Sequence, residues 1–245
     1  MKNKNENVGI LGNGQIGSSL AAFFKHPKIK DLKRDDGLRG VDVLHVSIPY
    51  SNEFVNIVKK EIKEIKPKLT IIHSTVAPGI TKKLVASLPR ELKMVVHSPV
   101  RGVHPQLFKG IKTFVKYIGA EDKKSAQMAK KHLESLGIKT KVFFPAATTE
   151  LGKILDTTYY GVAISWHKEM KKICDKFGID FENSVTDFNK TYNEGYAKLG
   201  KKNVIRPVLF VDNRCIGGHC VVPNAEILKK HFKSEALDLI LKYKK

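Results

Sequence analysis

The sequence predicts an α/β protein in which a doubly wound parallel sheet precedes a mostly α-helical domain. The apolar run Val8–Leu11 leads straight into a turn with three glycines, Gly12 to Gly17. Short apolar runs then alternate with helical stretches, which is typical of a sheet with helices on both faces. From Thr149 to Phe177 the chain has no proline and carries apolar side chains at helical spacing. We therefore expect a Rossmann-like domain over residues 1–147 and a helical domain over residues 148–245.

Each element of the first domain has its own signal. Apolar runs predict strands at 8–11, 41–48, 70–73, 94–97, 113–118 and 141–144, and a less apolar run predicts one at 29–34. Periodicity predicts helices at 18–24, 54–65 and 123–136, and Gly137 ends the last of them. Polar segments at 47–50, 73–79 and 97–102 directly follow strands. Because open α/β sheets bind ligands beyond the carboxyl ends of their strands, we expect the ligand site there.

Two long apolar stripes dominate the second half of the chain. The first runs along a helix over residues 149–177, which Gly178 ends. The second runs along a helix that carries Phe181, Val185, Phe188, Tyr192, Tyr196 and Leu199 on one face. Because a small domain cannot easily bury two such stripes alone, we expect a homodimer through this half.

Composition narrows the class of protein. The chain has 245 residues, 42% of them apolar and 28% charged, and this globular composition excludes wholesale disorder. No apolar run approaches the ~20 residues of a membrane span. The three cysteines are too few for a disulfide framework, and the sequence opens without a secretory signal. These features predict a cytoplasmic protein that does not enter the membrane.

The net charge of +20 is far from average. Such a charge attracts anions, among them nucleotides and phosphorylated sugars. The basic residues are scattered along the whole chain, and no run of five or more of them occurs. We therefore expect a small anionic substrate and disfavour nucleic acid as the main partner.

The glycine turn matches a dinucleotide-binding fingerprint, and it stands between a strand and a helix as that fingerprint requires. Glycines let the backbone approach a pyrophosphate, and the helix N-terminus offers unpaired N–H groups. An acidic residue about 20 positions later accepts the ribose hydroxyls, a role that we assign to Asp35 and that favours NAD over NADP. The alternative is that Asp35 and Asp36 form a solvated charge cluster. The expected cofactor-binding residues are Gly12, Asn13, Gly14, Gln15, Ile16, Gly17, Asp35, Pro49 and Ser74.

Cys220 is the candidate nucleophile among the three cysteines. Gly217 and Gly218 shortly precede it, so a substrate carbon can come close to the thiol. A nearby cation would raise its thiolate fraction. Cys174 lies on the apolar side of the long helix and fits a buried packing role. The cysteines around His219 have no distant pair of partner ligands, so their spacing argues against a metal site.

Six motifs of the chain occur together in a recognisable order. They are Gly12 to Gly17, Ser74 to Gly79, Ser98 to Arg101, Glu150 with Lys153, Phe177 to Asp180, and Gly217 to Cys220. In this order they resemble the nucleotide-sugar dehydrogenases, the family of UDP-glucose and UDP-N-acetylmannosamine dehydrogenases. The resemblance covers almost the whole chain, and the Gly-Gly-His-Cys element is its most specific part. It implies that NAD oxidises a nucleotide sugar twice, to the uronic acid.

The resemblance also implies a role for each matching residue. Cys220 would be the nucleophile that captures the aldehyde as a thiohemiacetal and holds the later thioester. Lys153 would stabilise the developing oxyanion, and Thr75 would position a water. The implied substrate-binding residues are Arg101, Thr157, Gly218, His219 and Asn224.

The chain departs from the family pattern at three polar positions. Val100 stands where the family has a glutamate, Thr157 where it has an asparagine, and Asn224 where it has an aspartate. In the family the glutamate and the aspartate handle protons and water, so their neutral replacements predict slow hydrolysis of a thioester. The resemblance further implies a shortened form that lacks the C-terminal nucleotide-binding domain.

Two other functions stay open on the sequence. A two-electron NAD-dependent dehydrogenase of a small hydroxy acid would use His97, His104 and Lys153 for acid–base chemistry and anion contacts. A degenerate, non-catalytic homologue would bind nucleotides or nucleic acid through its charge. The count of NADH molecules formed per substrate separates the four-electron from the two-electron reaction.

Overall fold

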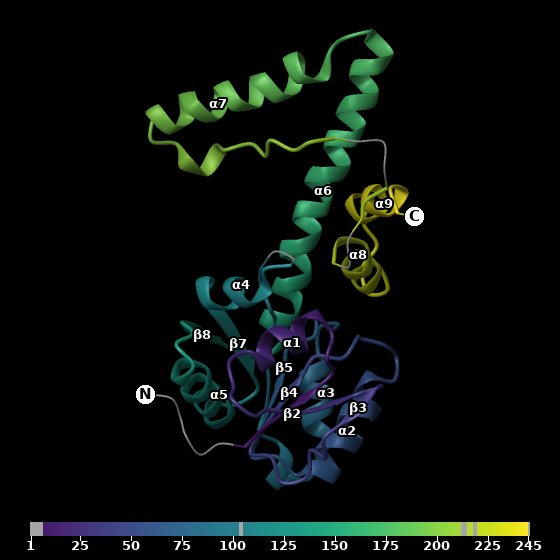
Figure 1. Cartoon of the computed structure of the whole chain (residues 1–245). Coiled ribbons are helices and arrows are strands. Elements are labelled where there is room, and N and C mark those ends of the chain that lie inside the picture. The colour runs from purple at the N-terminus through teal and green to yellow at the C-terminus, as the bar shows by residue number, and fades with distance from the viewer. Residues whose placement is uncertain (1–6, 103–104, 212–214, 218–219, 245) are drawn as a thin grey trace. The chain divides into compact units, whose positions relative to one another are not determined.

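A computed structural model describes residues 7–102, 105–211, 215–217 and 220–244 (Figure 1). The chain divides into two compact units, Met1–Lys153 and Ile154–Lys245, and each is described by itself. We call them the sheet unit and the helical unit. The boundary expected after residue 147 lies at the first turn of helix α6 (Ala147–Phe177), and the start of this helix belongs to the sheet unit.

The sheet unit is built on one eight-stranded sheet. Its strand order is β3-β2-β1-β4-β5-β6-β7-β8, and the strands from β2 to β6 in this order are parallel. Strand β3 pairs antiparallel with β2, β7 pairs antiparallel with β6, and β8 is parallel to β7. The strands are β1 (Val8–Leu11), β2 (Lys28–Asp31), β3 (Arg34–Asp35), β4 (Val43–Val46), β5 (Leu69–Ile72), β6 (Val95–His97), β7 (Lys116–Ala120) and β8 (Thr140–Phe143). The predicted fold class, a mostly parallel, Rossmann-like α/β sheet followed by a helical part, is confirmed.

Helices cover both faces of this sheet, because successive strand residues point to opposite faces and both sets are apolar. Ile71 packs in one core cluster with residues of α4 and α5, whereas its neighbour Ile72 packs in the other cluster with residues of α2 and α3. The helices of the unit are α1 (Gln15–Ala21), α2 (Phe54–Ile65), α3 (Ile80–Ala86), α4 (Leu107–Thr113) and α5 (Lys123–Ser135), with a 3-10 turn η1 (Arg90–Leu92). The doubly wound arrangement therefore follows from strands that are apolar on both sides.

Two elements differ from the sequence-based expectation. The strand expected at 29–34 is a short hairpin of β2 and β3, and Leu32 at its turn is fully exposed. The strand expected at 113–118 begins only at Lys116, because the preceding segment forms α4, which buries Leu107 and Ile111 one turn apart. Both differences arise where an apolar residue sits in a turn or on a helix.

The helical unit holds the rest of α6 and a short bundle at its side. Its elements after α6 are the π-helix η2 (Glu182–Thr186), α7 (Asp187–Lys198), the 3-10 helix η3 (Lys202–Val204), α8 (Val221–Lys229) and α9 (Glu235–Lys242). Gly178 follows α6 with a φ of +65°, a conformation that favours glycine. A Cβ atom at Gly161 would lie only 2.6 Å from Val221 Cγ1, so α6 and α8 pack through a glycine.

The apolar stripes of α6 and α7 remain largely exposed within this unit. Helix α7 buries no residue, and Phe188 and Leu199 are 60% and 72% exposed. On α6, Tyr159 and Phe177 are similarly open. None of the described helices is both long and apolar enough to cross a membrane.

Candidate active site

The glycine turn between β1 and α1 has the geometry that its sequence predicts. Gly12 has a φ of +94°, and a Cβ there would lie 2.9 Å from the backbone of Ser47. A Cβ at Gly17 would lie 1.9 Å from Gly12 O, so the third glycine lets α1 pack against the turn. A Cβ at Gly14, the N-cap of α1, would meet nothing within 4 Å. The turn is therefore closed toward the protein and open at the helix N-terminus, where an anion is favoured.

The acidic residue beside this turn is Asp31 rather than Asp35. Asp31 ends β2, and its Oδ2 accepts a hydrogen bond of 2.6 Å from the Asn13 N–H. Asp35 lies in the antiparallel β3, where it is exposed and accepts a bond from the Gly37 N–H. The sequence reasoning counted residues from the glycines, but the connection after α1 is short, so the end of β2 comes earlier. Locating the end of the second strand would have found Asp31.

The other loops of the same sheet edge carry Pro49, Ser74 and Thr75. Ser74 is buried, and its hydroxyl donates a 2.6 Å bond to Ile48 O, which ties the loops after β4 and β5 together. Pro49 is exposed and Thr75 is half-buried. Pro49 follows β4, the neighbour of β1, and Ser74 and Thr75 follow β5, the next strand of the sheet. A doubly wound sheet binds its ligand beyond strand ends of this kind.

Helix α6 starts at this edge and contributes Glu150 and Lys153. Glu150 is fully buried and accepts bonds from the Gly79 and Thr81 N–H groups and from the Thr81 hydroxyl, at 2.6, 2.8 and 2.6 Å. Burial raises the pKa of Glu150, although these bonds oppose the shift. Lys153 is half-buried, and its positive charge lowers the pKa values of His97 and Lys116. Glu150 thus anchors α6 to the start of α3, one turn before the candidate catalytic lysine.

Arg101 and Val100 both contact other residues of the sheet unit. The Arg101 Nη2 donates to Val115 O at 2.6 Å, and its guanidinium lies 4.3 Å from the ring centre of Tyr117. Val100 is buried in the core cluster with α4 and α5. Nothing titratable therefore occupies position 100, where the family resemblance had a glutamate.

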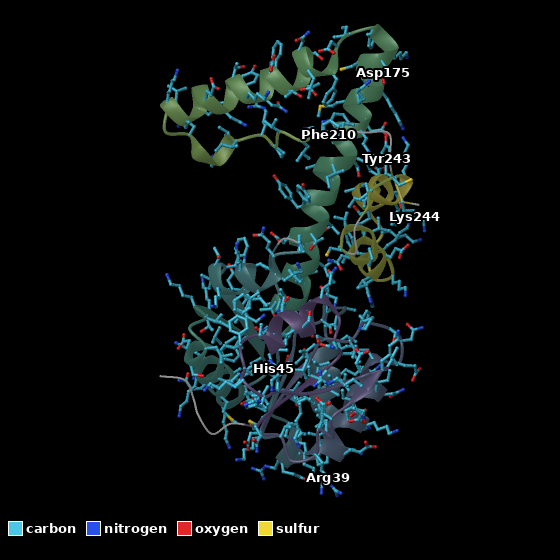
Figure 2. All side chains as sticks on the ribbon, viewed as in Figure 1. Arg39, His45, Asp175, Phe210, Tyr243 and Lys244 are labelled. Carbon is cyan, nitrogen blue, oxygen red and sulfur yellow. The ribbon has the colours of Figure 1, made fainter. Side chains whose placement is uncertain are left out.

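Sequence reasoning named His97 as a possible acid–base group, but it missed the buried basic cluster behind this edge to which His97 belongs. It consists of His45, His73, His97, His132 and Lys116, each at most 4% exposed, and Figure 2 labels His45 within the sheet unit. His45 Nδ1 lies 2.8 Å from His73 Nε2, and His45 Nε2 lies 3.0 Å from His132 Nε2. His73 Nδ1 and Lys116 Nζ both reach Ser98 O, at 2.9 and 2.8 Å.

The Ser98 carbonyl, at the end of this series of hydrogen bonds, determines which ring nitrogens carry a hydrogen. Ser98 O can only accept, so His73 Nδ1 carries a hydrogen, and its Nε2 accepts from His45. By the same logic His45 accepts from His132. Burial lowers the pKa values of His45 and His73 well below the usual range, which agrees with neutral rings. No single residue of the cluster forms a motif, which is why the sequence did not reveal it.

The helical unit carries Cys220, Thr157 and Asn224. Cys220 is half-buried at the N-cap of α8, and its carbonyl accepts the Asn224 N–H at 3.1 Å. Asn224 is 4% exposed, and within the described residues its Nδ2 has no hydrogen-bond partner. Thr157 is buried on α6. The predicted substrate residues Gly218 and His219 lie outside the described residues, as does His104.

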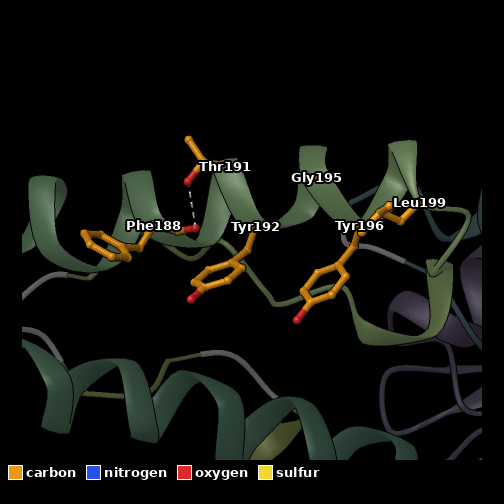
Figure 3. Close-up of a pocket in the computed structure, with 6 residues that line it drawn as sticks. All are labelled: Phe188, Thr191, Tyr192, Gly195, Tyr196 and Leu199. Carbon is orange, nitrogen blue, oxygen red and sulfur yellow. Dashed lines mark hydrogen bonds between the residues drawn. The ribbon is translucent and has the colours of Figure 1, made fainter.

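The other two cysteines differ in exposure. Cys174 is buried, with its sulfur 3.3 Å from Ser184 Oγ, as the packing interpretation expected, and Cys215 is exposed. Cys215 borders a pocket of about 360 Å³ that also involves His167, Lys168 and Phe210. A second, mostly apolar pocket of about 430 Å³ lies along α7 (Figure 3) and is lined by Phe188, Thr191, Tyr192, Gly195, Tyr196 and Leu199.

Comparisons with known proteins give relatives among the dehydrogenases. No family model matches the chain. UDP-N-acetyl-D-mannosamine dehydrogenase of Methanocaldococcus jannaschii is 31% identical over 169 residues, which are 66% of this chain and 36% of that protein. Its counterpart from Pyrococcus horikoshii is 23% identical over an alignment of 257 residues that covers 96% of this chain and 57% of that protein. The chain thus spans between about a third and three fifths of the curated relatives that it matches.

Solved structures show the same fold. The structure of the Pyrococcus horikoshii UDP-D-ManNAc dehydrogenase has a TM-score of 0.77 and 19% identity, and the match covers 97% of this chain and 68% of that one. A Mycobacterium tuberculosis 3-hydroxyisobutyrate dehydrogenase has a TM-score of 0.68 and 14% identity, with 97% and 93% covered. By sequence and fold, the chain is therefore a relative of the nucleotide-sugar dehydrogenases over the part of those proteins that it spans.

Proposed function

We propose that this chain is an NAD-dependent dehydrogenase that oxidises an alcohol of a sugar-type substrate, with UDP-sugars as the first candidates. The observation that carries the proposal is the glycine turn, closed by Gly12 and Gly17 and open at Gly14, with a carboxylate at the adjoining strand end. Residues 1–147 would form the cofactor-binding domain, and residues 148–245 would bind substrate and mediate dimerisation. All three cysteines are free, which supports a cytoplasmic protein.

The described residues fit a dinucleotide. The space at Gly14 and the N-terminus of α1 would take the pyrophosphate, and Asp31 would accept the ribose hydroxyls. A carboxylate at this position repels the 2′-phosphate of NADP, which supports NAD. When bound, NAD supplies the acceptor for the hydride of the alcohol carbon.

The proposed catalytic residues are Lys153, Thr75 and Cys220. Lys153 would stabilise the negative charge that develops on the substrate oxygen, and Thr75 would hold a water in place. The Cys220 thiolate would form a bond to the aldehyde carbon, and the carbonyl oxygen would become an alkoxide that takes a proton. Loss of a hydride from the adduct carbon to a second NAD, and of the hydroxyl proton to water, would leave a thioester, which water would cleave to the acid and the free thiol.

The test is the yield of NADH per substrate with a panel of UDP-sugars. We expect two NADH per sugar with the unmodified chain and one or none with Cys220→Ser, whereas Cys215→Ser serves as a matched control and retains two. Because Val100 and Asn224 replace acidic residues, the thioester is expected to hydrolyse slowly, and mass spectrometry should find an adduct on the Cys220 peptide. Full turnover in Cys220→Ala without any adduct contradicts the four-electron reaction.

A second candidate is a two-electron dehydrogenase of a small hydroxy acid. The fold match to a 3-hydroxyisobutyrate dehydrogenase covers nearly all of both chains, and this observation favours it. In this reaction Lys153 would be the main cation, and Cys220 would have no covalent role. One NADH per hydroxy acid, unchanged in Cys220→Ala, would support this alternative.

We also propose that two copies associate through the helical unit. Phe188 and Tyr192 on α7 and Leu199 at its C-cap form an exposed apolar face around the pocket of Figure 3, and a surface of this kind marks an interface. Light scattering at micromolar concentration is expected to give the mass of a dimer. A monomer under these conditions contradicts the proposal.

A further inference from the structure

Two side chains of the buried basic cluster hold backbone carbonyls at the ligand-binding edge of the sheet. His97 Nε2 lies 3.1 Å from Ser74 O. Lys116 Nζ lies 2.8 Å from Ser98 O and 3.1 Å from Pro99 O. His97 is fully buried and Lys116 is 4% exposed, so these carbonyls point into the protein.

The direction of each carbonyl sets the direction of the next N–H. The one cis peptide bond of the described chain is Phe144–Pro145, so the bonds that precede Thr75 and Val100 are trans. In a trans peptide the C=O and the following N–H point in opposite directions. The N–H groups of Thr75 and Val100 therefore point away from His97 and Lys116. Within the described ranges neither N–H donates a hydrogen bond.

These two N–H groups lie on adjacent loops. Strands β5 and β6 are parallel neighbours, with Ile72 opposite His97, and Thr75 and Val100 each follow this pair by three residues. The glycine turn and Asp31 belong to β1 and β2, on the other side of the point where the strand order reverses. A dinucleotide whose pyrophosphate lies on that turn and whose adenosine lies over β2 therefore extends its nicotinamide half over β4, β5 and β6.

We propose that His97 and Lys116 are positioning residues, which turn the N–H groups of Thr75 and Val100 toward the nicotinamide half of the bound dinucleotide. The inference rests on the proposed NAD site and names a part of it. Backbone donors do not depend on the side chain, so the valine at position 100 is compatible with this role. Because Ser74 O only accepts, His97 Nε2 carries its hydrogen, and Nδ1 accepts from the Thr149 hydroxyl at 2.8 Å.

The surroundings of Lys116 disfavour a positive charge on its buried amine. Burial lowers its pKa to about 7, and the positive charges of Lys153 and Arg101 act in the same direction. The charge of Lys116 in turn lowers the pKa values of His45, His73 and His97. Among the described residues no carboxylate pairs with Lys116, and a buried amine without such a partner destabilises the fold. The favourable contacts that Lys116 makes in return are its two hydrogen bonds, to Ser98 O and Pro99 O.

The test compares NAD with ADP-ribose, which lacks only the nicotinamide. In Lys116→Met and His97→Leu, we expect the affinity for NAD to fall about five- to tenfold, the value of one hydrogen bond, while the affinity for ADP-ribose is unchanged. His97→Gln keeps a donor near the Nε2 position and should restore NAD binding. Lys141→Met, which removes an exposed lysine of the neighbouring strand β8, is the matched control and should bind both ligands normally. Unchanged ratios of the two affinities in both Lys116→Met and His97→Leu overturn the inference.

A measurement on the unmodified chain covers the case in which these variants do not fold. In ¹⁵N-labelled protein, the amides of Thr75 and Val100 should shift when NAD binds and should shift much less with ADP-ribose. If both ligands bind and neither amide distinguishes them, the positioning role is wrong while the proposed cofactor stands. If neither ligand binds, the proposed function fails and this inference fails with it.

Discussion

The sheet unit and the helical unit differ in which side chains they bury and which they expose. The sheet unit buries His45, Lys116 and Glu150 and gives each of them hydrogen-bond partners. The helical unit leaves large apolar side chains such as Phe188 and Leu199 open, and α7 buries nothing. The sheet unit therefore holds several buried titratable groups, whereas the helical unit exposes an apolar face.

Acid is expected to destabilise the sheet unit strongly. Burial lowers the pKa values of His45, His73 and His97 from 6.5, the last to about 3. Below pH 6.5 these three histidines therefore bind protons in the unfolded chain but stay neutral in the folded unit. The free energy of unfolding consequently falls as the pH falls. Each group contributes at most ~1.4 kcal/mol per pH unit, and the three together at most ~4 kcal/mol per unit.

Urea unfolding at pH 6, 5 and 4, followed by a probe in the sheet unit, measures this slope. His231 is exposed in the turn after α8, so His231→Gln is the matched control and should leave the slope unchanged. His73→Asn should lower the slope. A free energy of unfolding that is constant from pH 6 to pH 4 would show that the buried rings titrate normally.

Replacing one glycine of each unit by alanine should change the stability of the two units in opposite directions. A Cβ at Gly17 would lie 1.9 Å from Gly12 O, so Gly17→Ala is expected to destabilise the sheet unit by roughly 3 kcal/mol. A Cβ at Gly195 in α7 would meet nothing within 4 Å, so Gly195→Ala should stabilise its helix by about 0.5–1 kcal/mol. Denaturant unfolding of the two variants checks both values, and a destabilising Gly195→Ala would mean that α7 is covered more tightly than described.

Polar substitution on α7 should change association without much change in folding. Phe188→Ser and Leu199→Ser remove exposed side chains, so the free energy of unfolding of the monomer should move by less than ~0.5 kcal/mol. The same variants should weaken the proposed dimer, because its apolar contact is lost. Sedimentation at several concentrations measures both species. Dimers of unchanged affinity would place the interface elsewhere.

Much of the fold was predictable because its signals are local. Helix α2 has the predicted bounds of 54–65, and α6 ends at Phe177 before Gly178 as expected. The β2–β3 hairpin was not predictable, since Lys28–Asp31 has little apolar character and its pairing is decided by the neighbouring strand β1. The antiparallel direction of β7 is likewise a property of the whole sheet.

The candidate site likewise has a part that local sequence signals predict and a part that they do not. The glycine turn could be predicted because each glycine meets a local steric requirement, at Gly12 by its φ and at Gly17 by its contact. Asp31 could not be assigned by counting, because the length of the α1–β2 connection sets its position. The pairing of His45 with His73 and His132 brings together residues 28 and 87 positions apart, and no spacing rule connects them.

Binding of NAD to Gly14→Val is the most direct test of the central claim. Gly14 has an extended backbone conformation, and a Cβ there touches nothing within 4 Å, so valine should leave folding intact. The added side chain would occupy the space proposed for the pyrophosphate, and we expect calorimetry to show a loss of NAD affinity of about 100-fold. The melting temperature without ligand should stay close to that of the unmodified chain. Unchanged NAD affinity in a folded Gly14→Val variant would contradict a cofactor site at the glycine turn.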